Sequence, residues 1–269
     1  MGLFPHRDAE IFYEIHGDGP PLLLIPGGPG VSAVYQALGN QLADRWTVIT
    51  YDLPGHGRSS GPRDRDNTVR DQADLAAQLL AHLGRSRSTV FGTSYGAVIA
   101  VDMLARHPSL VQALVVHEPI MIELLTDAPT WRAFFDQIIH AADTEAAFAQ
   151  FMAAVHAGSG PGEGFIPPAI PPFSGGTEER AFSLRHELPH AVSYLPDIAQ
   201  LARAGAPIAV LAGTESESTF YGQSARELAC RLNIPCTPIR GGHLGHFMHP
   251  VSFAATLSQV MADLTSSPA

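Results

Sequence analysis

Lysine is absent from this chain of 269 residues, and all 16 of its basic side chains are arginine. An amine is the reactive group of Schiff-base and pyridoxal-phosphate enzymes, and it holds phosphates in phosphate-loop proteins and kinases. These three classes of enzyme are therefore excluded.

Basic charge is also scarce overall, because 26 carboxylates outnumber the arginines and give a formal net charge of -10. A nucleic-acid binder needs a basic stripe that displaces counterions from phosphates. Arg63, Arg65 and Arg70 instead alternate with aspartates, which is typical of a solvated loop. We expect no nucleic-acid partner.

Cysteine is scarce, and long apolar runs are absent. Cys230 and Cys236 are too few for a disulfide scaffold and wrongly spaced for a zinc ribbon, so we expect reduced thiols. Residues 1–10 do not resemble a signal peptide, and no stretch of 18 uncharged apolar residues occurs. These absences predict a cytoplasmic protein without a membrane partner.

What is present is an alternation of short apolar runs with helical patterns, which is typical of a parallel sheet covered by helices on both faces. One helix is predicted over Thr68 to Leu83, with Asn67 as its N-cap. From Pro119 to about Leu201 only helical segments and a proline-rich loop occur. We therefore predict an α/β core domain of residues 1–118 and 202–269 with a helical cap inserted at 119–201. The predicted strands are Phe12 to Ile15, Leu22 to Ile25, Thr47 to Tyr51, Ser88 to Phe91, Ala113 to His117, Ile208 to Ala212 and Cys236 to Ile239.

A GxSxG pattern, Gly92 to Gly96, lies between a predicted strand and a predicted helix. A nucleophilic serine on so tight a turn needs neighbours without bulky side chains, and the two glycines provide them. The positive end of the following helix also favours an oxyanion. Ser94 is the predicted nucleophile.

A second glycine cluster, Pro26 to Gly30, follows the strand that ends at Ile25. Acyl transfer needs two backbone amides aimed at the developing oxyanion. Tyr95, directly after the serine, supplies the first, and Gly28 is the natural second donor because Pro29 has no amide hydrogen.

Three histidines near the C-terminus compete for the role of general base. His243 follows two glycines that let the chain turn sharply towards the predicted site, so we favour it over His246 and His249. Their spacing also invites a metal site, but no carboxylate lies among them, and we expect neither a metal nor a cofactor.

These motifs, together with Tyr51 to Ser59 and Pro250, resemble the α/β-hydrolase superfamily over essentially the whole chain. The resemblance implies an eight-stranded, mostly parallel sheet, a cap inserted after the sixth strand and a catalytic triad in the chain order serine, acid, histidine.

The acid departs from the family pattern, because the position where relatives usually carry aspartate is Ser216 here. Glu215 and Glu217 are adjacent, but each would need the loop to shift by a residue. Glu118 ends the sixth strand at the same sheet edge, and some lactonases of the superfamily are similar in placing a glutamate there. We predict Glu118 as the acid, with Glu217 and Glu215 as alternatives; the competing interpretation of Glu118 is a carboxylate that caps a helix.

The predicted reaction is hydrolysis of an ester or lactone, since position 94 is not the aspartate of epoxide hydrolases and haloalkane dehalogenases. A thioesterase or a peptidase would use the same triad, but Pro26 replaces the histidine found in the similar loop of proline iminopeptidases. A ligand-binding relative with little or no turnover is a further alternative. We expect a small-molecule partner, a monomer or homodimer, and a lid between Gly158 and Gly176. The cap side chains that suggest an apolar substrate are Phe134, Phe135, Phe148, Phe151, Met152, Phe165, Ile166 and Phe173.

Overall fold

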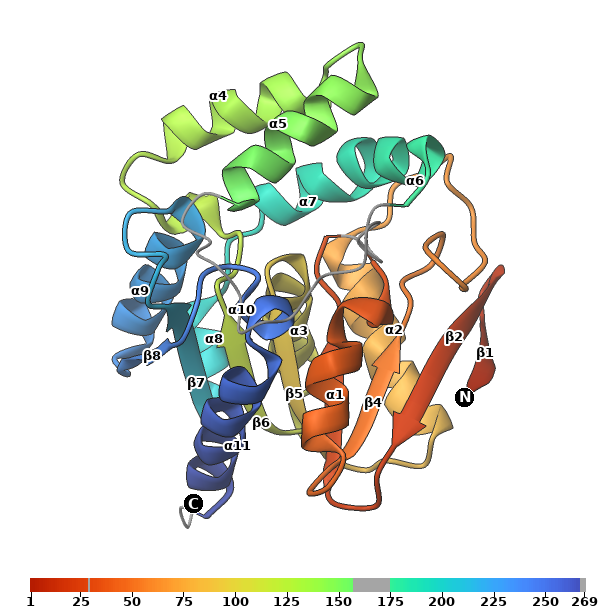
Figure 1. Cartoon of the computed structure of the whole chain (residues 1–269), viewed down its shortest axis with the longest axis vertical. Helices are drawn as coiled ribbons and strands as arrows, with labels where there is room; N and C mark the ends of the chain where they lie inside the picture. Colours follow the sequence, from red (N-terminus) through yellow and green to blue (C-terminus); the bar gives the residue numbers. More distant parts are fainter. Residues whose placement is uncertain (29, 157–174, 267–269) are drawn as a thin grey trace.

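An eight-stranded sheet forms the centre of the computed structural model, which describes residues 1–28, 30–156 and 175–266 (Figure 1). The strand order is β1-β2-β4-β3-β5-β6-β7-β8, with antiparallel pairing for β1 with β2 and β2 with β4 and parallel pairing elsewhere. This confirms the predicted α/β class and the mostly parallel sheet. The strands are β1 (Gly2–His6), β2 (Ala9–His16), β3 (Pro21–Ile25), β4 (Thr47–Tyr51), β5 (Ser88–Thr93), β6 (Val111–His117), β7 (Ile208–Gly213) and β8 (Cys236–Ile239).

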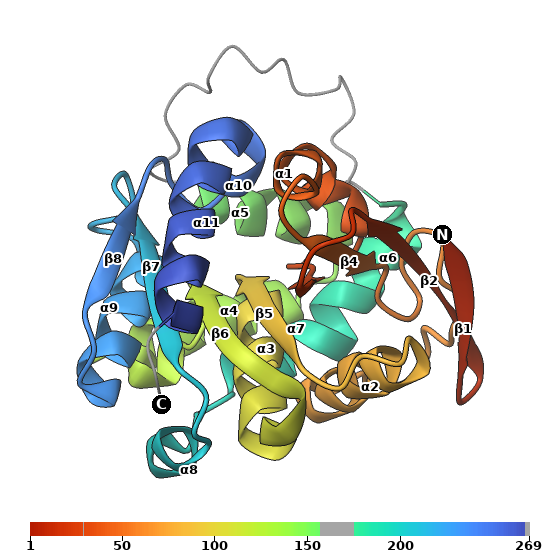
Figure 2. The ribbon, with the colours of Figure 1, turned by 90° about the horizontal axis from the view of Figure 1, so that it is seen from below.

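Helices cover both faces of the sheet, as the view from below shows (Figure 2). One face carries α1 (Gln36–Leu42) and α11 (Pro250–Ser266), next to the short α10 (Gly245–Met248). The other face carries α2 (Val69–His82), α3 (Tyr95–Arg106), α8 (Ile198–Arg203) and α9 (Phe220–Leu232).

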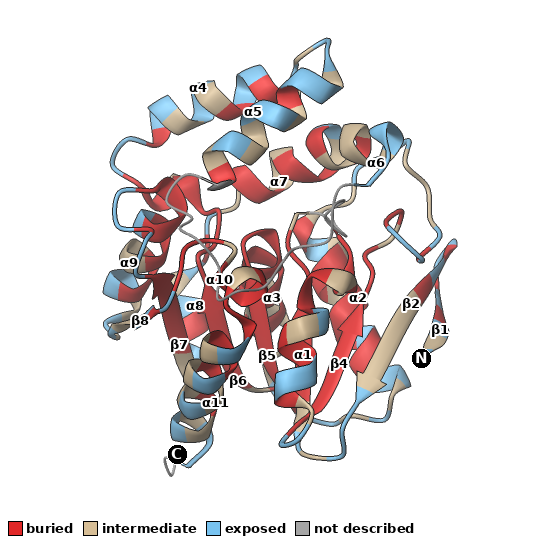
Figure 3. Ribbon diagram, viewed as in Figure 1, coloured by how far each residue is buried: buried red, intermediate tan, exposed pale blue. Residues whose placement is uncertain are grey.

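Strand β3 shows why a doubly covered sheet needs continuous apolar runs. Leu23 and Ile25 pack against the α2 and α3 face, whereas Leu22 and Leu24 pack against the α1 and α11 face. All four side chains are fully buried, and each contributes about 1.5–3 kcal/mol by leaving water. The central strands of the sheet, such as β4, β5, β6 and β7, are coloured as buried along most of their length (Figure 3).

Two local features differ from the sequence prediction. Strand β1 was missed because only Phe4 and His6 point inward, so no apolar run marks it. The N-cap of α2 is Thr68, whose side chain accepts a hydrogen bond from the amide of Asp71, and not Asn67. No helix in the described part of the chain is both long and apolar enough to cross a membrane.

Between β6 and α8, α-helices of the described residues form a layer above the sheet in Figure 1. They are α4 (Ala128–Ile139), α5 (Thr144–His156), α6 (Thr177–Phe182) and α7 (Leu188–Val192). Helix α8 contains residue 201, where the predicted cap ends. It packs beside α3 and α9, among the helices that cover the sheet.

A buried polar cluster connects this upper layer to the loop after β4. Nε2 of His56 lies 2.8 Å from the carboxylate of Glu187, and both side chains are 2% exposed. The side chain of Asn67 donates a second hydrogen bond to Glu187 at 3.0 Å. Burial lowers the pKa of His56, but the charge and hydrogen bond of Glu187, together with Glu179, outweigh burial and raise it. Asn67 therefore anchors the upper layer, which explains why it does not cap α2.

The turn from β5 into α3 brings α3 unusually close to β3. A Cβ added to Gly96 would lie 2.2 Å from the carbonyl oxygen of Ile25, and one added to Gly92 would lie 2.2 Å from the carbonyl oxygen of Gly96. Backbone atoms cannot move aside cheaply at such distances. The two glycines of the GxSxG pattern are thus required by packing.

Replacing Glu187 by glutamine should destabilise the protein in a pH-dependent way. At pH 6, where His56 is protonated, we expect a loss of about 3–5 kcal/mol, because His56 keeps a buried charge without its partner. A raised folded pKa stabilises below the unfolded value of 6.5, and that stabilisation is lost as pH rises through the folded pKa. Chemical denaturation at pH 6 and pH 9 should therefore give a smaller loss at pH 9. The control is Glu178→Gln, at a 90% exposed carboxylate near Arg63, which should lower the free energy of unfolding by less than about 0.5 kcal/mol. If Glu187→Gln lowered the free energy of unfolding equally at both pH values, the prediction would be contradicted.

Gly96→Ala should destabilise the fold by about 3 kcal/mol, because the new methyl group overpacks α3 against β3. The matched control is Gly39→Ala in α1, where the nearest atom, Cγ1 of Val48, lies at an ordinary 3.7 Å. That change should be neutral or stabilising by up to about 1 kcal/mol, since alanine favours a helix. Urea unfolding of both variants checks this difference, and equal stabilities would be inconsistent with the close approach.

Candidate active site

Ser94 lies on the sharp turn between β5 and α3. Its backbone is held at φ 57° and ψ -124°, and its amide donates to the carbonyl of His117 on the adjacent strand at 3.1 Å. A residue other than glycine in such a conformation stores about 1–3 kcal/mol of strain, which the surrounding strands must support. Ser94 is 8% exposed, so the side chain is accessible only from one side.

The glycine loop after β3 lies directly beside this turn. The Cβ position of Gly27 is 3.4 Å from Cβ of Ser94, and Gly28 lines the same cavity as Ser94. The carbonyl of Gly28 accepts a hydrogen bond from the hydroxyl of Ser183 at 3.2 Å, which connects this loop to the layer above the sheet. Tyr95, the other predicted amide donor, is the first residue of α3. Pro29 falls outside the described residues.

His243 and Glu118 form a buried pair next to Ser94. Nδ1 of His243 lies 2.9 Å from Oε2 of Glu118, and the side chains are 3% and 0% exposed. The other oxygen of Glu118, Oε1, accepts the amide of Gly213 at 2.7 Å. Nε2 of His243 makes no hydrogen bond within the described part of the chain, and the ring lines the same cavity as Ser94. A histidine with one nitrogen held by a carboxylate and the other unpaired is arranged to accept a proton.

The carboxylate of Glu118 is held in its ionised form. Burial acts to raise its pKa, but the imidazoles of His117 and His243 lower it to about 2. Burial lowers the pKa of His117 to about 4, so that ring is neutral near pH 7. Glu118 also has a positive φ of 44°, so two of the strained non-glycine residues found in the described ranges lie in this site.

The two alternative acids lie elsewhere. Glu215 and Glu217 are both exposed, and Glu217 lines a separate depression beside Arg226. Ser216, at the usual aspartate position of the family pattern, is fully buried beside Glu118. Of the three candidate glutamates, the fold brings Glu118 to the histidine.

The two other candidate histidines lack a carboxylate partner in the described structure. His246 lines the cavity, and burial with the neighbouring imidazoles lowers its pKa well below 6.5, so it is neutral near pH 7. His249 is buried beneath Gly241. The described residues contain no group of three metal-ligating side chains.

The cavity in front of Ser94 has largely apolar walls and is open to solvent, and the space within it, open part included, is about 500 Å³. Helix α5 contributes three side chains, among which Phe151 lies 4.0 Å from the Cβ position of Gly28. The residues that line the cavity are Gly27, Gly28, Val34, Thr93, Ser94, Phe151, Met152, Val155, His243, Leu244 and His246.

Sequence patterns missed several of these residues. Phe151 and Met152 belong to the apolar residues of the predicted cap, but no sequence pattern distinguishes them from Phe135, which is buried in the core, or from Phe134 and Phe148, which pack against the core but do not line this cavity. His117 and Tyr221 have rings that lie near His243, but neither residue is part of a recognised sequence motif. Residues 158–174 of the predicted lid, which include Phe165, Ile166 and Phe173, lie outside the described residues.

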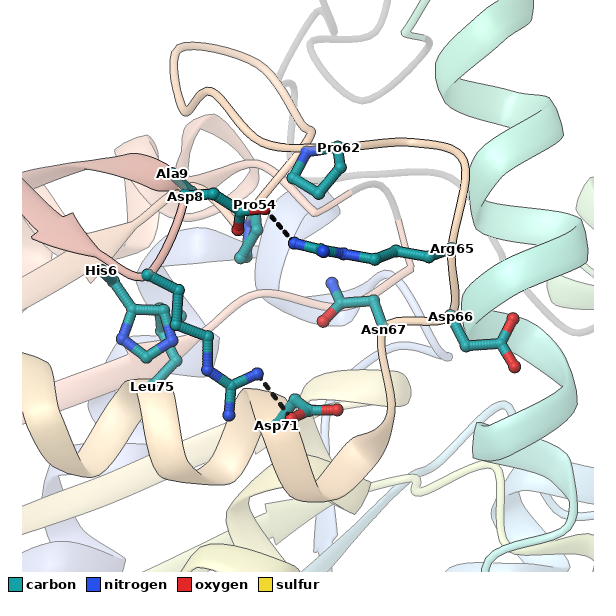
Figure 4. Close-up of a pocket in the computed structure, with 11 residues that line it drawn as sticks. His6, Asp8, Ala9, Pro54, Pro62, Arg65, Asp66, Asn67, Asp71 and Leu75 are labelled. Atoms are coloured by element: carbon teal, nitrogen blue, oxygen red, sulfur yellow. Dashed lines mark hydrogen bonds and ion pairs between the residues drawn. The ribbon is translucent and has the colours of Figure 1, made fainter.

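A second pocket lies at the start of α2, between the β1–β2 turn and the loop after β4 (Figure 4). Four of its charged side chains pair with each other: Arg7 with Asp71 at 2.7 Å, and Arg65 with Asp8. The fifth, Asp66, contacts His186 at 2.9 Å instead. The pocket contains none of the predicted site residues.

Comparisons with known proteins agree with this architecture. Residues 20–251 match the family model described as alpha/beta hydrolase fold. An uncharacterized hydrolase of Bacillus subtilis, YraK, is 41% identical over 118 residues, which are 44% of this chain and 44% of that protein, so the match spans less than half of the relative. The α/β hydrolase MGS-M2 from a deep-sea metagenome has a similar structure, with a TM-score of 0.76, 20% identity and 97% coverage of both chains. Carboxylesterase CesB of Bacillus subtilis gives a TM-score of 0.69 at 18% identity, covering 100% of this chain and 92% of that one. The chain belongs to the α/β-hydrolase fold family.

Proposed function

We propose that this protein is a serine hydrolase that cleaves a carboxylic ester or lactone of a largely apolar small molecule. The observation that carries the proposal is that Ser94 and His243 line the same cavity. Nδ1 of His243 is at the same time hydrogen-bonded to the buried carboxylate of Glu118. A strained serine, an imidazole with one unpaired nitrogen and a buried carboxylate are the three parts of an acyl-transfer triad.

In the proposed mechanism, Nε2 of His243 takes the proton of Ser94 as Oγ attacks the carbonyl carbon of the substrate. The amides of Gly28 and Tyr95 bind the oxyanion of the tetrahedral intermediate. His243 then protonates the leaving alcohol, and the acyl group remains on Ser94. Water, deprotonated by the same imidazole, releases the acid and restores the serine.

Glu118 keeps the imidazole in one tautomer and stabilises the imidazolium that forms during both steps. Its low pKa, about 2, means that this carboxylate stays ionised near neutral pH, where the imidazolium forms. The accepted hydrogen bond from Gly213 leaves the other carboxylate oxygen free to face His243.

The substrate class follows from the cavity and the cap. Phe151, Met152, Val155, Val34 and Leu244 present apolar groups beside the nucleophile, which favours an apolar acyl or alcohol part. Residues 119–201 would act as the cap that selects the substrate, over a core of residues 1–118 and 202–269. The similarity to a carboxylesterase supports ester hydrolysis in particular.

Hydrolysis of p-nitrophenyl esters of increasing acyl length tests this proposal. We expect kcat/KM to rise by about three- to fourfold per methylene until the cavity is filled, because each buried methylene contributes about 0.8 kcal/mol. Ser94→Ala should abolish both hydrolysis and labelling by a fluorophosphonate, whereas Ser218→Ala, at an exposed serine, should change neither. Binding of the esters without Ser94-dependent release would identify a ligand-binding protein instead.

Glu118→Gln should lower kcat by about 10³- to 10⁴-fold, because the amide cannot stabilise the imidazolium by charge. Glutamine can still accept the amide of Gly213, so the fold should be retained, as circular dichroism can check. Glu215→Gln and Glu217→Gln are matched controls that should stay within about twofold of the parent, since exposed charges are screened by water. Near-normal turnover by Glu118→Gln would remove it from the triad.

A further inference from the structure

Tyr221 stands between the cap and the base of the proposed triad. It is the second residue of α9 and is fully buried. The centroid of its ring lies 4.1 Å from that of His243, with the two planes inclined by 36°. Its hydroxyl donates a hydrogen bond to the carbonyl of Val155 on α5 at 3.2 Å.

We propose that Tyr221 is a positioning residue, whose ring holds the imidazole of His243 in place while its hydroxyl anchors cap helix α5 to the same site. This inference rests on the proposed function, and it adds a residue that neither the family pattern nor the sequence motifs indicate.

The hydrogen bond to Glu118 fixes Nδ1 of His243 but leaves the ring free to rotate about the Nδ1···Oε2 direction. An aromatic face at 4.1 Å blocks that rotation. The electron-rich face also attracts the imidazolium that forms when Ser94 loses its proton, as in other cation–π pairs. Tyr221 thereby acts on the same ring as Glu118 through a second, independent contact.

The hydroxyl connects this ring to the cavity wall. Burial and the negative charge of Glu118 raise the pKa of Tyr221 to about 12, so the hydroxyl keeps its proton and remains a donor. Its acceptor, Val155, lines the cavity on the same helix as Phe151 and Met152. The placement of α5 over a substrate and the orientation of the imidazole therefore depend on one side chain.

Phe220 provides a matched control. It is the preceding residue and is 2% exposed, and the centroid of its ring lies 4.6 Å from that of Trp131, 5.5 Å from that of Phe135 and 5.0 Å from that of Tyr221. Truncating Phe220 removes a ring from the same aromatic cluster but leaves the contact between Tyr221 and His243.

The test compares the parent protein with Tyr221→Leu, Tyr221→Met, Tyr221→Phe and Phe220→Leu. The first readout, which needs no turnover, is the downfield proton resonance of Nδ1–H of His243 in its hydrogen bond to Glu118. The second is the rate at which a small fluorophosphonate labels Ser94. Methionine fills a volume similar to that of the ring, so it keeps the test valid if the leucine variant does not fold.

We expect Tyr221→Leu and Tyr221→Met to lose the resonance and to be labelled about ten- to a hundredfold more slowly, because the imidazole is no longer held in its reactive geometry. Tyr221→Phe and Phe220→Leu should keep the resonance and the labelling rate. Tyr221→Phe should raise KM for a long-chain ester by up to about fivefold with kcat unchanged, since α5 loses one neutral hydrogen bond.

An unchanged resonance and rate in the leucine and methionine variants would overturn the inference, as would an equal loss in Phe220→Leu. A loss in Tyr221→Phe as large as in Tyr221→Leu would show that the hydroxyl, and not the ring, acts on His243. If the parent protein neither hydrolyses esters nor labels at Ser94, the proposed function fails, while the resonance still decides the role of Tyr221.

Discussion

The hydrogen bond between Glu118 and His243 depends on the parallel register of β6 and β7, and the remaining site is built around it. The amide of Glu118 pairs with the carbonyl of Leu211, and its side chain then reaches the amide of Gly213 at the end of β7. Two strands must end together for this to occur, and a shift of one residue would turn the carboxylate to the opposite face. The doubly covered sheet supplies that register, because both faces are closed by apolar packing.

Local chemistry explains how much of the site the sequence could predict. The GxSxG turn and the glycine loop after β3 are recognisable because close backbone approach requires glycine at particular positions. The choice among Glu118, Glu215 and Glu217 was harder, because the distance from each carboxylate to the imidazole is set by residues far apart in the chain. No local sequence pattern indicates the positive φ of Glu118.

Other features were beyond local patterns for the same reason. Strand β1 is amphipathic over only five residues and contains a proline, so its pairing with β2 is what makes it a strand. Asn67 has the side chain of an N-cap, but the buried carboxylate of Glu187, 120 residues away, accepts its hydrogen bond and Thr68 caps the helix. Tertiary partners decide between such competing local roles.

Ser216 beside Glu118 has an implication for how the acid can change place within this fold. An aspartate at position 216 would put a second carboxylate next to a fully buried one, and two such groups cannot both remain ionised at low cost. The two acid positions therefore exclude each other. A chain that moves its acid from one strand end to the other must therefore pass through a sequence in which one of the two positions is neutral, and position 216 of this chain carries the neutral residue serine.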